Sequence, residues 1–548
     1  MSYALSDDQL RGAPFHLDAQ ALNWVKETFA RLDEPAKLCQ ILIPMCRDLS
    51  EDATRQLAQR GFGGVHRFPS FSEDELRGSA QILTEGALVP PLLTADLELS
   101  EKASVKAGTL FPNQMTVAAT SDPQNALRMG ALAAREAGYL GFHLSWTPVA
   151  DLPLNPRSNV VNTRSFSADC DKTITFMSAY IDGMHANGMA ACVKHFPGDG
   201  LDDRDQHFVT TTNPMEMPAW HNSFGRIFRA AIARDVRVIM AGHIRLPAHD
   251  PSGLPASQSA PLLQGLLRDG LGYNGAIVSD ATLMNGFRSQ GPRSQIVPQC
   301  IEAGCDILLF PLNIDEDLAH LAAGLKSELL SPRRLDEAVL RILALKASLG
   351  LHRDAGLPGP ERRAELLGTD EHRKWTQEVV QGAVTLLRDR LQLLPLDPRR
   401  HRRILLAEAT GRRSPSSPLP DLEIAALLEA EGFVITRLQP GAAIDASAHD
   451  VGLYLMAEEG LSGKEHLGPQ WERLHGAFPA SMERLWHYLP TVYVSLGTPF
   501  LPCHMPDCPT FVNAYSPIKP MQQAVVAALC GRIGFAGISP ADVTGGMG

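Results

Sequence analysis

The stretch KHFPGDGLDDRDQH places a lysine, two histidines, four aspartates and an arginine within residues 194–207. Elsewhere in the chain Asp96, Asp151, His243 and Asp280 each come at the end of a short apolar run. A pocket lined by fixed cations and carboxylates suits a neutral polyol such as a sugar, because charge-assisted hydrogen bonds to hydroxyls are roughly twice as strong as neutral ones. The sequence has no GxGxxG, P-loop, GxSxG or HExxH motif, so it carries no fingerprint of nucleotide, serine-hydrolase or zinc-protease chemistry.

Eight short apolar runs that could place these groups lie between residues 38 and 311, each separated from the next by enough chain for a helix. Segments 125–140 and 224–236 repeat apolar residues at helical spacing. This alternation predicts a (β/α)8 TIM-type barrel, although a doubly wound sheet gives a similar pattern. The polar residues end several different runs, which favours the barrel, because an open sheet gathers such groups at one switch point. The predicted strands are 39–46, 64–68, 91–98, 145–152, 189–196, 236–244, 275–281 and 306–311.

A second α/β pattern follows a segment rich in proline, glycine and charge. We predict a catalytic barrel over residues 1–350, a linker over 351–374 and a second domain over 375–548. The second domain starts with a helical pattern over 375–389 and continues with five strand-like runs, which predicts a smaller three-layer α/β/α sandwich. Its predicted strands are 403–409, 432–438, 451–457, 491–497 and 510–516.

Composition narrows the classes of partner. The 548 residues carry 50 basic and 61 acidic side chains, a net charge of −11, which argues against nucleic acid or an anionic membrane surface as a partner. No apolar run is long enough to span a membrane and no signal peptide is visible, so we expect a cytoplasmic protein. The nine cysteines, mostly inside apolar segments, are expected to be free thiols. We expect no metal and no cofactor, and the oligomeric state stays open, a dimer included.

A series of distinct motifs is spread in a fixed order along nearly the whole chain. They are GTLFPNQM (108–115), TPVADLPLNPRSNVVNTRSF (147–166), KHFPGDG with DQH, IVSDA (277–281), AVTLLRDRLQLLPL (383–396) and the pair VYVSLGTPFLP and FVNAYSP within 492–517. This series resembles the β-N-acetylglucosaminidase branch of glycoside hydrolase family 3, in its two-domain form. In that branch the third motif reads KHFPGHG…DSH.

The resemblance implies an exo-acting, retaining β-N-acetylglucosaminidase that needs no cofactor. It makes Asp280 the nucleophile that forms a covalent glycosyl-enzyme, His207 the general acid/base, and Asp205 the partner that orients the His207 imidazole. Asp96, Arg164, Lys194 and His195 become contacts to the hydroxyls of the terminal sugar. An oligosaccharide or a cell-wall muropeptide is the implied substrate, the latter in peptidoglycan recycling.

Physical chemistry is consistent with a histidine in that role. Its reference pKa of about 6.5 lies near operating pH. An aspartate two residues earlier can bind one ring nitrogen and leave the other to transfer the proton. Gly198 and Gly200 allow backbone angles that would let the loop carry His207 over a bound sugar.

Some positions depart from the family pattern. Asp199 stands where the pattern has histidine, and DLELS (96–100) replaces DxEGG, which affects the contacts near Glu98. The reaction class is therefore implied more directly than specificity for the acetamido group. His243 either lines the pocket or is a satisfied core histidine.

Three other functions remain open at this stage. A histidine does not repel an incoming phosphate as a glutamate would, so a phosphorylase acting on β-N-acetylglucosaminides or β-glucosides is one alternative. A β-glucosidase is another. A non-catalytic sugar-binding protein on the same fold is the third, and the joint presence of Asp280, Asp205 and His207 argues against it.

Overall fold

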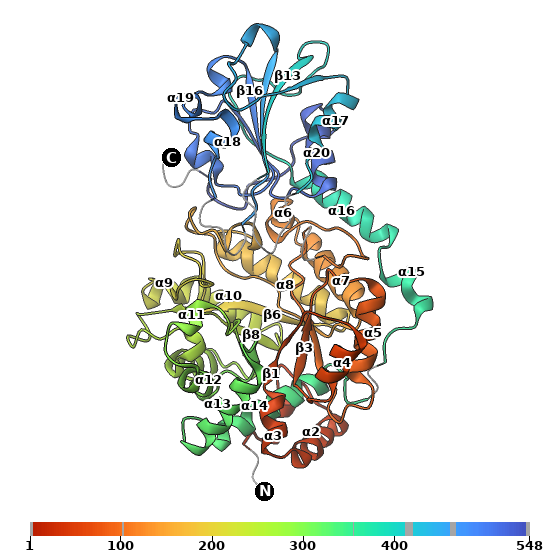
Figure 1. Ribbon diagram of the computed structural model, residues 1–548, viewed down its shortest axis with the longest axis vertical. Coiled ribbons are helices and arrows are strands. Elements are labelled where there is room, and N and C mark those ends of the chain that lie inside the picture. Colours follow the sequence, from red (N-terminus) through yellow and green to blue (C-terminus); the bar gives the residue numbers. More distant parts are fainter. Residues whose placement is uncertain (1–3, 101–103, 354–355, 411–419, 461–466, 544–548) are drawn as a thin grey trace.

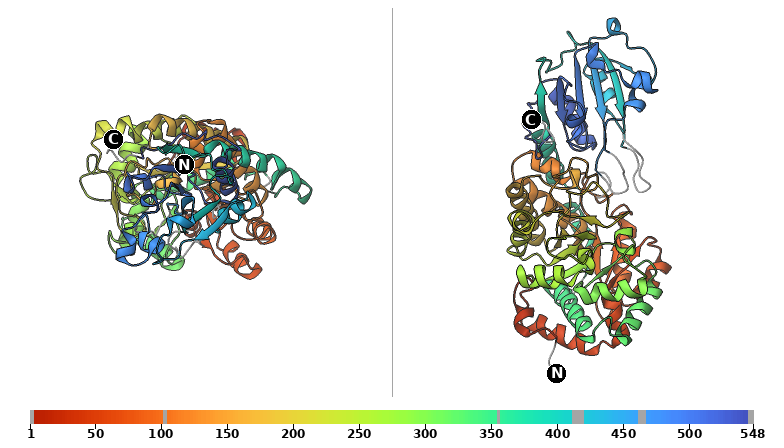
Figure 2. Two further views of the ribbon diagram at one scale, coloured as in Figure 1. Left: turned by 90° about the horizontal axis from the view of Figure 1, so that it is seen from above. Right: turned by 90° about the vertical axis from the view of Figure 1, so that its left-hand side faces the viewer.

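A computed structural model describes residues 4–100, 104–353, 356–410, 420–460 and 467–543. The chain forms two domains stacked along the long axis of the molecule, with the N-terminal domain at one end and the C-terminal domain at the other (Figures 1 and 2). Within the described ranges, no helix combines the length and apolar character needed to cross a membrane.

The N-terminal domain is built on parallel strands, as the alternating pattern predicts. Seven strand segments form one continuous sheet in the order β10-β8-β6-β5-β4-β3-β2. β1 pairs in parallel with β11, and a bridge between Val278 and Ile307 joins β10 to β11, so the sheet curls back on itself. The fold class is confirmed as a TIM-like parallel barrel. The barrel strands are β1 (Leu42–Ile43), β2 (Met45–Cys46), β3 (Gly64–Arg67), β4 (Leu92–Ala95), β5 (Leu144–Ser145), β6 (Ala190–Phe196), β8 (Val238–Ala241), β10 (Ala276–Ser279) and β11 (Leu308–Leu309).

Helices surround the barrel and follow its strands (Figure 1). The two helices predicted from periodicity are present as α7 (Gln124–Tyr139) and α10 (Phe224–Ile232). Capping residues define where several of these helices begin. At α5 the Ser72 side chain accepts the Glu75 N–H, and the Ser72 backbone N–H donates to the Glu75 side chain. The other surrounding helices are α2 (Ala19–Arg31), α3 (Glu34–Gln40), α4 (Glu51–Ala58), α5 (Glu73–Thr84), α8 (Cys170–Ala186), a π-type helix over Pro261–Gly270, α12 (Arg293–Ala303), α13 (Ile314–Lys326) and α14 (Pro332–Ser348).

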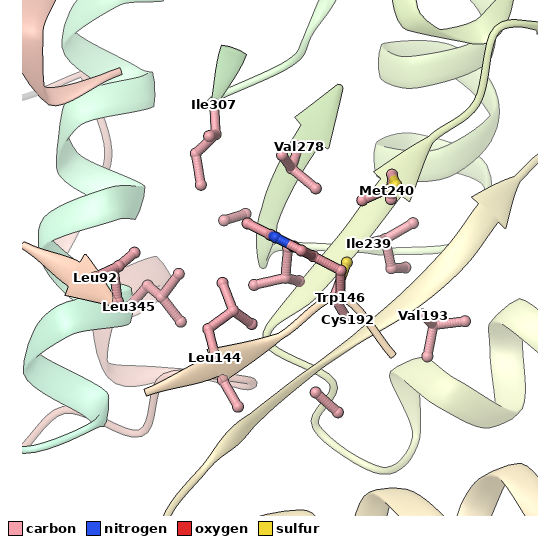
Figure 3. Close-up of a cluster of buried hydrophobic side chains, with 14 of the residues drawn as sticks. Leu92, Leu144, Trp146, Cys192, Val193, Ile239, Met240, Val278, Ile307 and Leu345 are labelled. Carbon is pink, nitrogen blue, oxygen red and sulfur yellow. The ribbon is translucent and has the colours of Figure 1, made fainter. Parts of the chain in front are cut away.

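The barrel interior is a packed core, and the reactive polar groups predicted from the sequence lie at its rim. Figure 3 shows Trp146 among Leu144, Cys192, Ile239 and Val278, which come from different strands. Indole rings and thiols pack well in apolar surroundings, provided that the indole N–H has a hydrogen-bond partner. The Trp146 Nε1–H donates to the buried His66 Nδ1 at 3.1 Å. The strands therefore hold fixed positions from which their carboxyl ends can present polar groups.

The C-terminal domain is a three-layer α/β sandwich. Its sheet has the order β12-β17-β16-β15-β13-β14, and all neighbouring pairs are parallel except β12 with β17. Helices lie on both faces, with α17 and α20 on one side and α18 and α19 on the other (Figure 1). The elements are α16 (Asp370–Ala383), β12 (Thr385–Asp389), β13 (Arg403–Ala409), α17 (Ile424–Ala430), β14 (Val434–Arg437), β15 (Val451–Met456), α18 (Trp471–His475), α19 (Phe478–Ser481), β16 (Thr491–Ser495), β17 (Thr510–Asn513) and α20 (Lys519–Leu529).

The helix predicted over residues 375–389 is wrong at its end. The helix α16 stops at Ala383, and Thr385–Asp389 form the sixth strand, β12, paired antiparallel with β17. The apolar residues of this strand continue the helical spacing of α16, so periodicity alone gave no boundary. Between the domains, residues 356–369 include the short helix α15 (Arg363–Leu366), while residues 354–355 of the predicted linker lie outside the described residues.

The two domains share part of a core. The short helix α6 (Gln114–Ala119) belongs to the barrel domain, yet Met115 and Ala119 pack into the apolar core beneath the C-terminal sheet. Near its end the chain returns to the barrel, where the Ile538 N–H donates to the Ala119 carbonyl at 2.9 Å. Helix α6 is thus in contact with the second domain both through its apolar side chains and through the backbone near the end of the chain.

Candidate active site

The polar residues named from strand ends meet at one rim of the barrel. Asp96 follows β4, Lys194 and His195 lie in β6, and Asp280 follows β10 directly. Asp151 lies beyond β5 in a segment that still pairs with β6 through a bridge between Val149 and Lys194. Because all the strands run in parallel, their carboxyl ends gather these side chains at the same face.

Two cations on one side of the rim are held by acidic partners. The Arg164 guanidinium makes a two-pronged contact with Glu98, Nε to Oε2 and Nη2 to Oε1, both at 2.7 Å. Lys194 Nζ lies 2.7 Å from Glu98 Oε1 and 3.0 Å from Asp96 Oδ1. The Asp96 side chain is 43% exposed, so it stands at the edge of the site and can also accept from a ligand hydroxyl.

The same contacts fix the charge of these groups. Burial alone would raise the pKa of the Glu98 carboxyl, but Arg164 and Lys194 hold it below its usual range. Burial alone would lower the pKa of Lys194, and Asp96 and Glu98 raise it instead. The site therefore presents a charged lysine and arginine whose orientation is set before any ligand binds. The DLELS segment, which departs from the family pattern, supplies the central carboxylate of this cluster.

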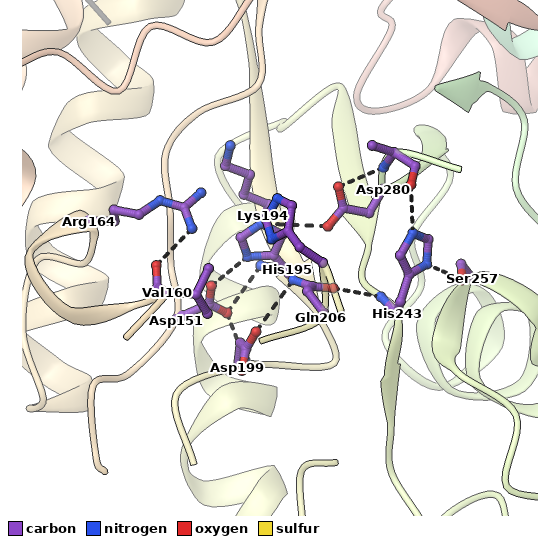
Figure 4. Close-up of polar contacts among 12 residues, drawn as sticks. Asp151, Val160, Arg164, Lys194, His195, Asp199, Gln206, His243, Ser257 and Asp280 are labelled. Atoms are coloured by element: carbon purple, nitrogen blue, oxygen red, sulfur yellow. Dashed lines mark hydrogen bonds and ion pairs between the residues drawn. The ribbon is translucent and has the colours of Figure 1, made fainter. Parts of the chain in front are cut away.

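His195 connects the Arg164 and Lys194 side of the rim to Asp280 (Figure 4). Its Nδ1 lies 2.6 Å from Asp151 Oδ2, and its backbone N–H donates to Asp151 Oδ1 at 3.1 Å. Its Nε2 is 3.9 Å from Asp280 Oδ2. Asp151 thereby sets the ring orientation, and the far nitrogen of the ring faces Asp280.

The Asp280 carboxylate, the predicted nucleophile, is largely buried at the rim. Its side chain is 12% exposed, and its Oδ1 accepts the Ala281 N–H at 2.7 Å. Burial raises the pKa of Asp280, but His195, His243, His207 and the Ala281 N–H more than offset that effect and lower it overall. The carboxylate is therefore ionised at neutral pH and surrounded by groups that can balance its charge.

Asp205 and His207 form a hydrogen-bonded pair on the loop after β6. His207 Nδ1 lies 2.7 Å from Asp205 Oδ1, and the same oxygen accepts the His207 backbone N–H at 2.8 Å. The ring is 37% exposed. Because the Asp205 carboxylate accepts a hydrogen bond from the Nδ1–H, Nε2 is the nitrogen that can give and take a proton.

The loop that carries this pair is docked beside Asp280. Asn285, which begins α11 (Asn285–Arg288) shortly after Asp280, donates its N–H to the His207 carbonyl at 2.9 Å and its Nδ2–H to the Phe208 carbonyl at 2.7 Å. At the loop's start the glycines serve a tight path. Gly198 and Gly200 have φ of 118° and 104°, and a Cβ at Gly198 would lie 2.2 Å from the Phe224 ring. Both glycines thus adopt the backbone angles that the sequence predicts, and Gly198 packs closely against the Phe224 ring.

The sequence left His243 open between pocket and core, and it did not single out Gln206. His243 is fully buried, with Nδ1 2.8 Å from Ser257 Oγ and Nε2 3.1 Å from the Ala281 carbonyl, so it is both hydrogen-bonded in the core and adjacent to Asp280. Gln206 lies between Asp205 and His207 and accepts the His243 N–H at 2.8 Å. Its signals in the sequence were its place between the two members of the pair and its departure from the serine of the family's DSH motif. No cluster of three or more His, Cys, Asp or Glu side chains is arranged to hold a metal ion within the described ranges.

Comparisons with known proteins cover both domains. A family profile described as "Glycosyl hydrolase family 3 N terminal domain" matches residues 32–345. The chain is 36% identical over 557 residues to a β-N-acetylglucosaminidase/β-glucosidase from Cellulomonas fimi, covering 97% of this chain and 98% of that protein. It is 35% identical over 236 residues to a β-hexosaminidase from Stenotrophomonas maltophilia (strain R551-3), covering 42% of this chain and 67% of that protein.

Solved structures give the same result. The β-glucoside phosphorylase BglX bound to 2FGlc has a TM-score of 0.92 at 29% identity, covering 99% of this chain and 100% of that one. A family 3 β-N-acetylglucosaminidase from Paenibacillus sp. str. FPU-7 has a TM-score of 0.79 at 25% identity, covering 94% and 99%. The profile, the full-length relative and the two-domain structures agree that the chain belongs to glycoside hydrolase family 3.

Proposed function

We propose that this protein is an exo-acting, retaining β-N-acetylglucosaminidase that hydrolyses terminal β-linked N-acetylglucosamine. The observation that carries the proposal is the His207–Asp205 pair, held by Asn285 beside the Asp280 carboxylate. A nucleophile and a proton donor on either side of one glycosidic bond are the two parts that a retaining glycosidase needs. A histidine in place of the more usual second carboxyl is the feature shared with the β-N-acetylglucosaminidase pattern.

In the first step an Asp280 carboxylate oxygen forms a bond to C1 of the sugar while the bond from C1 to the leaving-group oxygen breaks. His207 gives its Nε2 proton to that oxygen, and Asp205 stabilises the ring by accepting its other N–H. In the second step a water gives a proton to the neutral His207, its oxygen bonds to C1, and the bond to Asp280 breaks. Two inversions at C1 retain the β configuration.

The sugar is held by the cations at the rim. Lys194 and Arg164 are fixed by Glu98, and Asp96 is partly exposed beside them, so donors and an acceptor face the same space. Together with His195 they suit adjacent hydroxyls of one terminal sugar ring, which supports exo action.

Names of relatives divide over the substrate. The Cellulomonas fimi protein is named for both N-acetylglucosaminides and glucosides, and the BglX structure is named as a β-glucoside phosphorylase. The high structural similarity to BglX favours one second candidate, a phosphorylase. At its second step phosphate would replace water, and a histidine repels that anion less than a glutamate would.

Turnover of nitrophenyl glycosides by the pure protein separates these functions. We expect nitrophenyl β-N-acetylglucosaminide to be cleaved with a higher kcat/KM than the β-glucoside, and turnover to proceed without phosphate. Strong preference for the glucoside would contradict the proposed specificity. Formation of a glycosyl phosphate in phosphate buffer, with little turnover in a non-nucleophilic buffer, would make the protein a phosphorylase.

The nucleophile has its own test. Replacing Asp280 by asparagine removes the attacking carboxylate while keeping the shape of the side chain, so turnover should fall by several orders of magnitude. A fluorinated glycoside that traps the intermediate should label the unaltered protein at Asp280, detected by mass spectrometry of its peptides. Labelling of another residue would overturn the assignment.

A further inference from the structure

Asp199 and Gln206, two residues without a role in the scheme above, touch each other beneath the loop that carries His207. Gln206 Nε2 donates to Asp199 Oδ2 at 3.4 Å (Figure 4). Both side chains are almost fully buried, with 3% of Asp199 and 1% of Gln206 exposed. They also occupy the two positions at which KHFPGDG…DQH differs from KHFPGHG…DSH. The two departures from the pattern are therefore in contact with one another.

Gln206 is fixed from three directions. Its Oε1 accepts the His243 N–H at 2.8 Å, its Nε2 donates to Asp199, and its backbone carbonyl accepts the Gly286 N–H at 3.1 Å. Gln206 directly joins Asp205 to His207 in the chain. Any change in its position therefore moves the backbone between the two members of the pair.

Asp199 ties this anchor to the sugar side of the rim. Its Oδ1 accepts the Gly200 N–H at 2.7 Å, and its backbone N–H donates to Asp151 Oδ1 at 2.8 Å. Asp151 also holds both the ring and the backbone of His195. Hydrogen bonds thus run without a break from His195 through Asp151, Asp199 and Gln206 to His243, which lies beside Asp280.

The carboxylate at position 199 is costly to the fold. Burial and, after it, the nearby Asp151 carboxylate raise the pKa of Asp199 to about 7, with Asp205 adding to the effect and His195 opposing it. No arginine or lysine is paired with Asp199 within the described ranges. A buried acid near two other carboxylates lowers the stability of the fold, which points to a role for Asp199 in the site.

We propose that Asp199 and Gln206 form a positioning pair that sets the place of His207 for proton transfer. The proposal rests on the proposed role of His207 as general acid/base. Neither residue touches the reacting atoms. Both act on His207 through the backbone of the loop that carries it. Loss of the pair should therefore weaken proton transfer more than it weakens sugar binding or attack by Asp280.

The chemistry of amides allows a sharp test by exchange. In Asp199→Asn one oxygen becomes an NH₂ group, so either the Gly200 N–H or the Gln206 NH₂ faces another donor. Turning the Gln206 amide only moves the conflict to the His243 N–H. Adding Gln206→Glu supplies two acceptors, one for His243 and one for the new NH₂ group at position 199. At a pH above 7, where Asp199 is ionised, the double variant restores the contact with donor and acceptor exchanged and with the same total charge.

The measurement is kcat/KM over aryl glycosides, made with whichever sugar the unaltered protein prefers, whose phenols range from strong to weak acids. Weakly acidic phenols need the proton from His207, whereas dinitrophenol leaves without it. For Asp199→Asn we expect a loss of about tenfold or more with the weakest acids and at most about threefold with dinitrophenol. The double variant should regain most of that loss. Asp203→Asn, the same change at an exposed position of the same loop, should match the unaltered protein.

Each result decides the matter. An equal loss on all leaving groups, no loss, or no recovery in the double variant overturns the positioning role. If Asp199→Asn does not fold, Gln206→Ala breaks the same contact from its other side. It is judged by the same slope, that of log kcat/KM against the pKa of the leaving phenol. His207→Ala serves as reference, because a flat slope there means that the acid/base assignment has failed. A steep slope there with a flat one for Asp199→Asn rejects the positioning pair alone.

Discussion

Glu98 shows how one residue can prepare a sugar site. Its two oxygens accept from Arg164 and Lys194, which would otherwise repel each other across the space proposed for the sugar hydroxyls. With the carboxylate present, both cations are held at fixed positions and their remaining N–H groups stay available. The free-energy cost of ordering these groups is then incurred during folding and not during substrate binding.

Replacing Glu98 by glutamine should weaken substrate binding more than chemistry. The amide keeps one acceptor but loses the charge and places an NH₂ group against a cation. We expect KM to rise about tenfold or more, since a charged hydrogen bond contributes roughly 1.5–3 kcal/mol, while kcat falls much less. Steady-state kinetics on a nitrophenyl glycoside measures both constants. A large fall in kcat with KM unchanged would instead place Glu98 in the chemical step.

Among the elements, helix α14 carries an ionisable group where the core should be apolar. Lys346 is fully buried, and its Nζ donates to Gln40 Oε1 at 2.7 Å. Burial lowers the pKa of Lys346 to about 7. In the unfolded chain a lysine has a pKa of about 10.4, so between these values the unfolded state binds more protons and stability rises with pH.

Lys346→Met should remove this dependence. At pH below 7 the unaltered protein carries the full penalty, and the variant should be more stable by an amount on the order of a few kcal/mol. The difference should shrink as pH rises toward 10. Urea unfolding at two pH values measures it, with Lys374→Met, at an exposed position, as the control. A stability difference that is the same at both pH values would contradict the buried, neutral amine.

Elements also mark how far a sequence can be interpreted. The rim residues Asp96, Lys194 and Asp280 were predictable, because a parallel barrel places the ends of all its strands at one face. Strand β12 was not, because its apolar spacing continues that of α16 and only pairing with β17 decides its conformation. The Asp199–Gln206 contact could not be predicted either, since it depends on how a loop folds back over positions seven residues apart.

At the scale of the whole molecule, the second domain completes the structure around the site face. Asn113 caps helix α6 by accepting the Thr116 N–H at 3.0 Å, and its Nδ2 donates to the Tyr515 carbonyl and to Glu459 Oε1, both at 2.9 Å. Asn162, two residues before Arg164, donates to Thr498 Oγ1 at 3.0 Å. The segments that carry GTLFPNQM and NTRSF are thus supported from the C-terminal domain.

Two substitutions at Asn113 separate the cap from the contact between domains. Asn113→Ala removes both and should lower stability by about 2–4 kcal/mol, the combined effect of a lost cap and buried hydrogen bonds. Asn113→Asp keeps the capping oxygen but turns a second oxygen toward Glu459 and the Tyr515 carbonyl, so the interdomain contact becomes repulsive. We expect thermal unfolding, followed by circular dichroism, to show a clear loss for both variants. If Asn113→Asp were as stable as the unaltered protein, the cap alone would explain the residue, and the two domains would be joined by their shared apolar core around Met115 and Ala119.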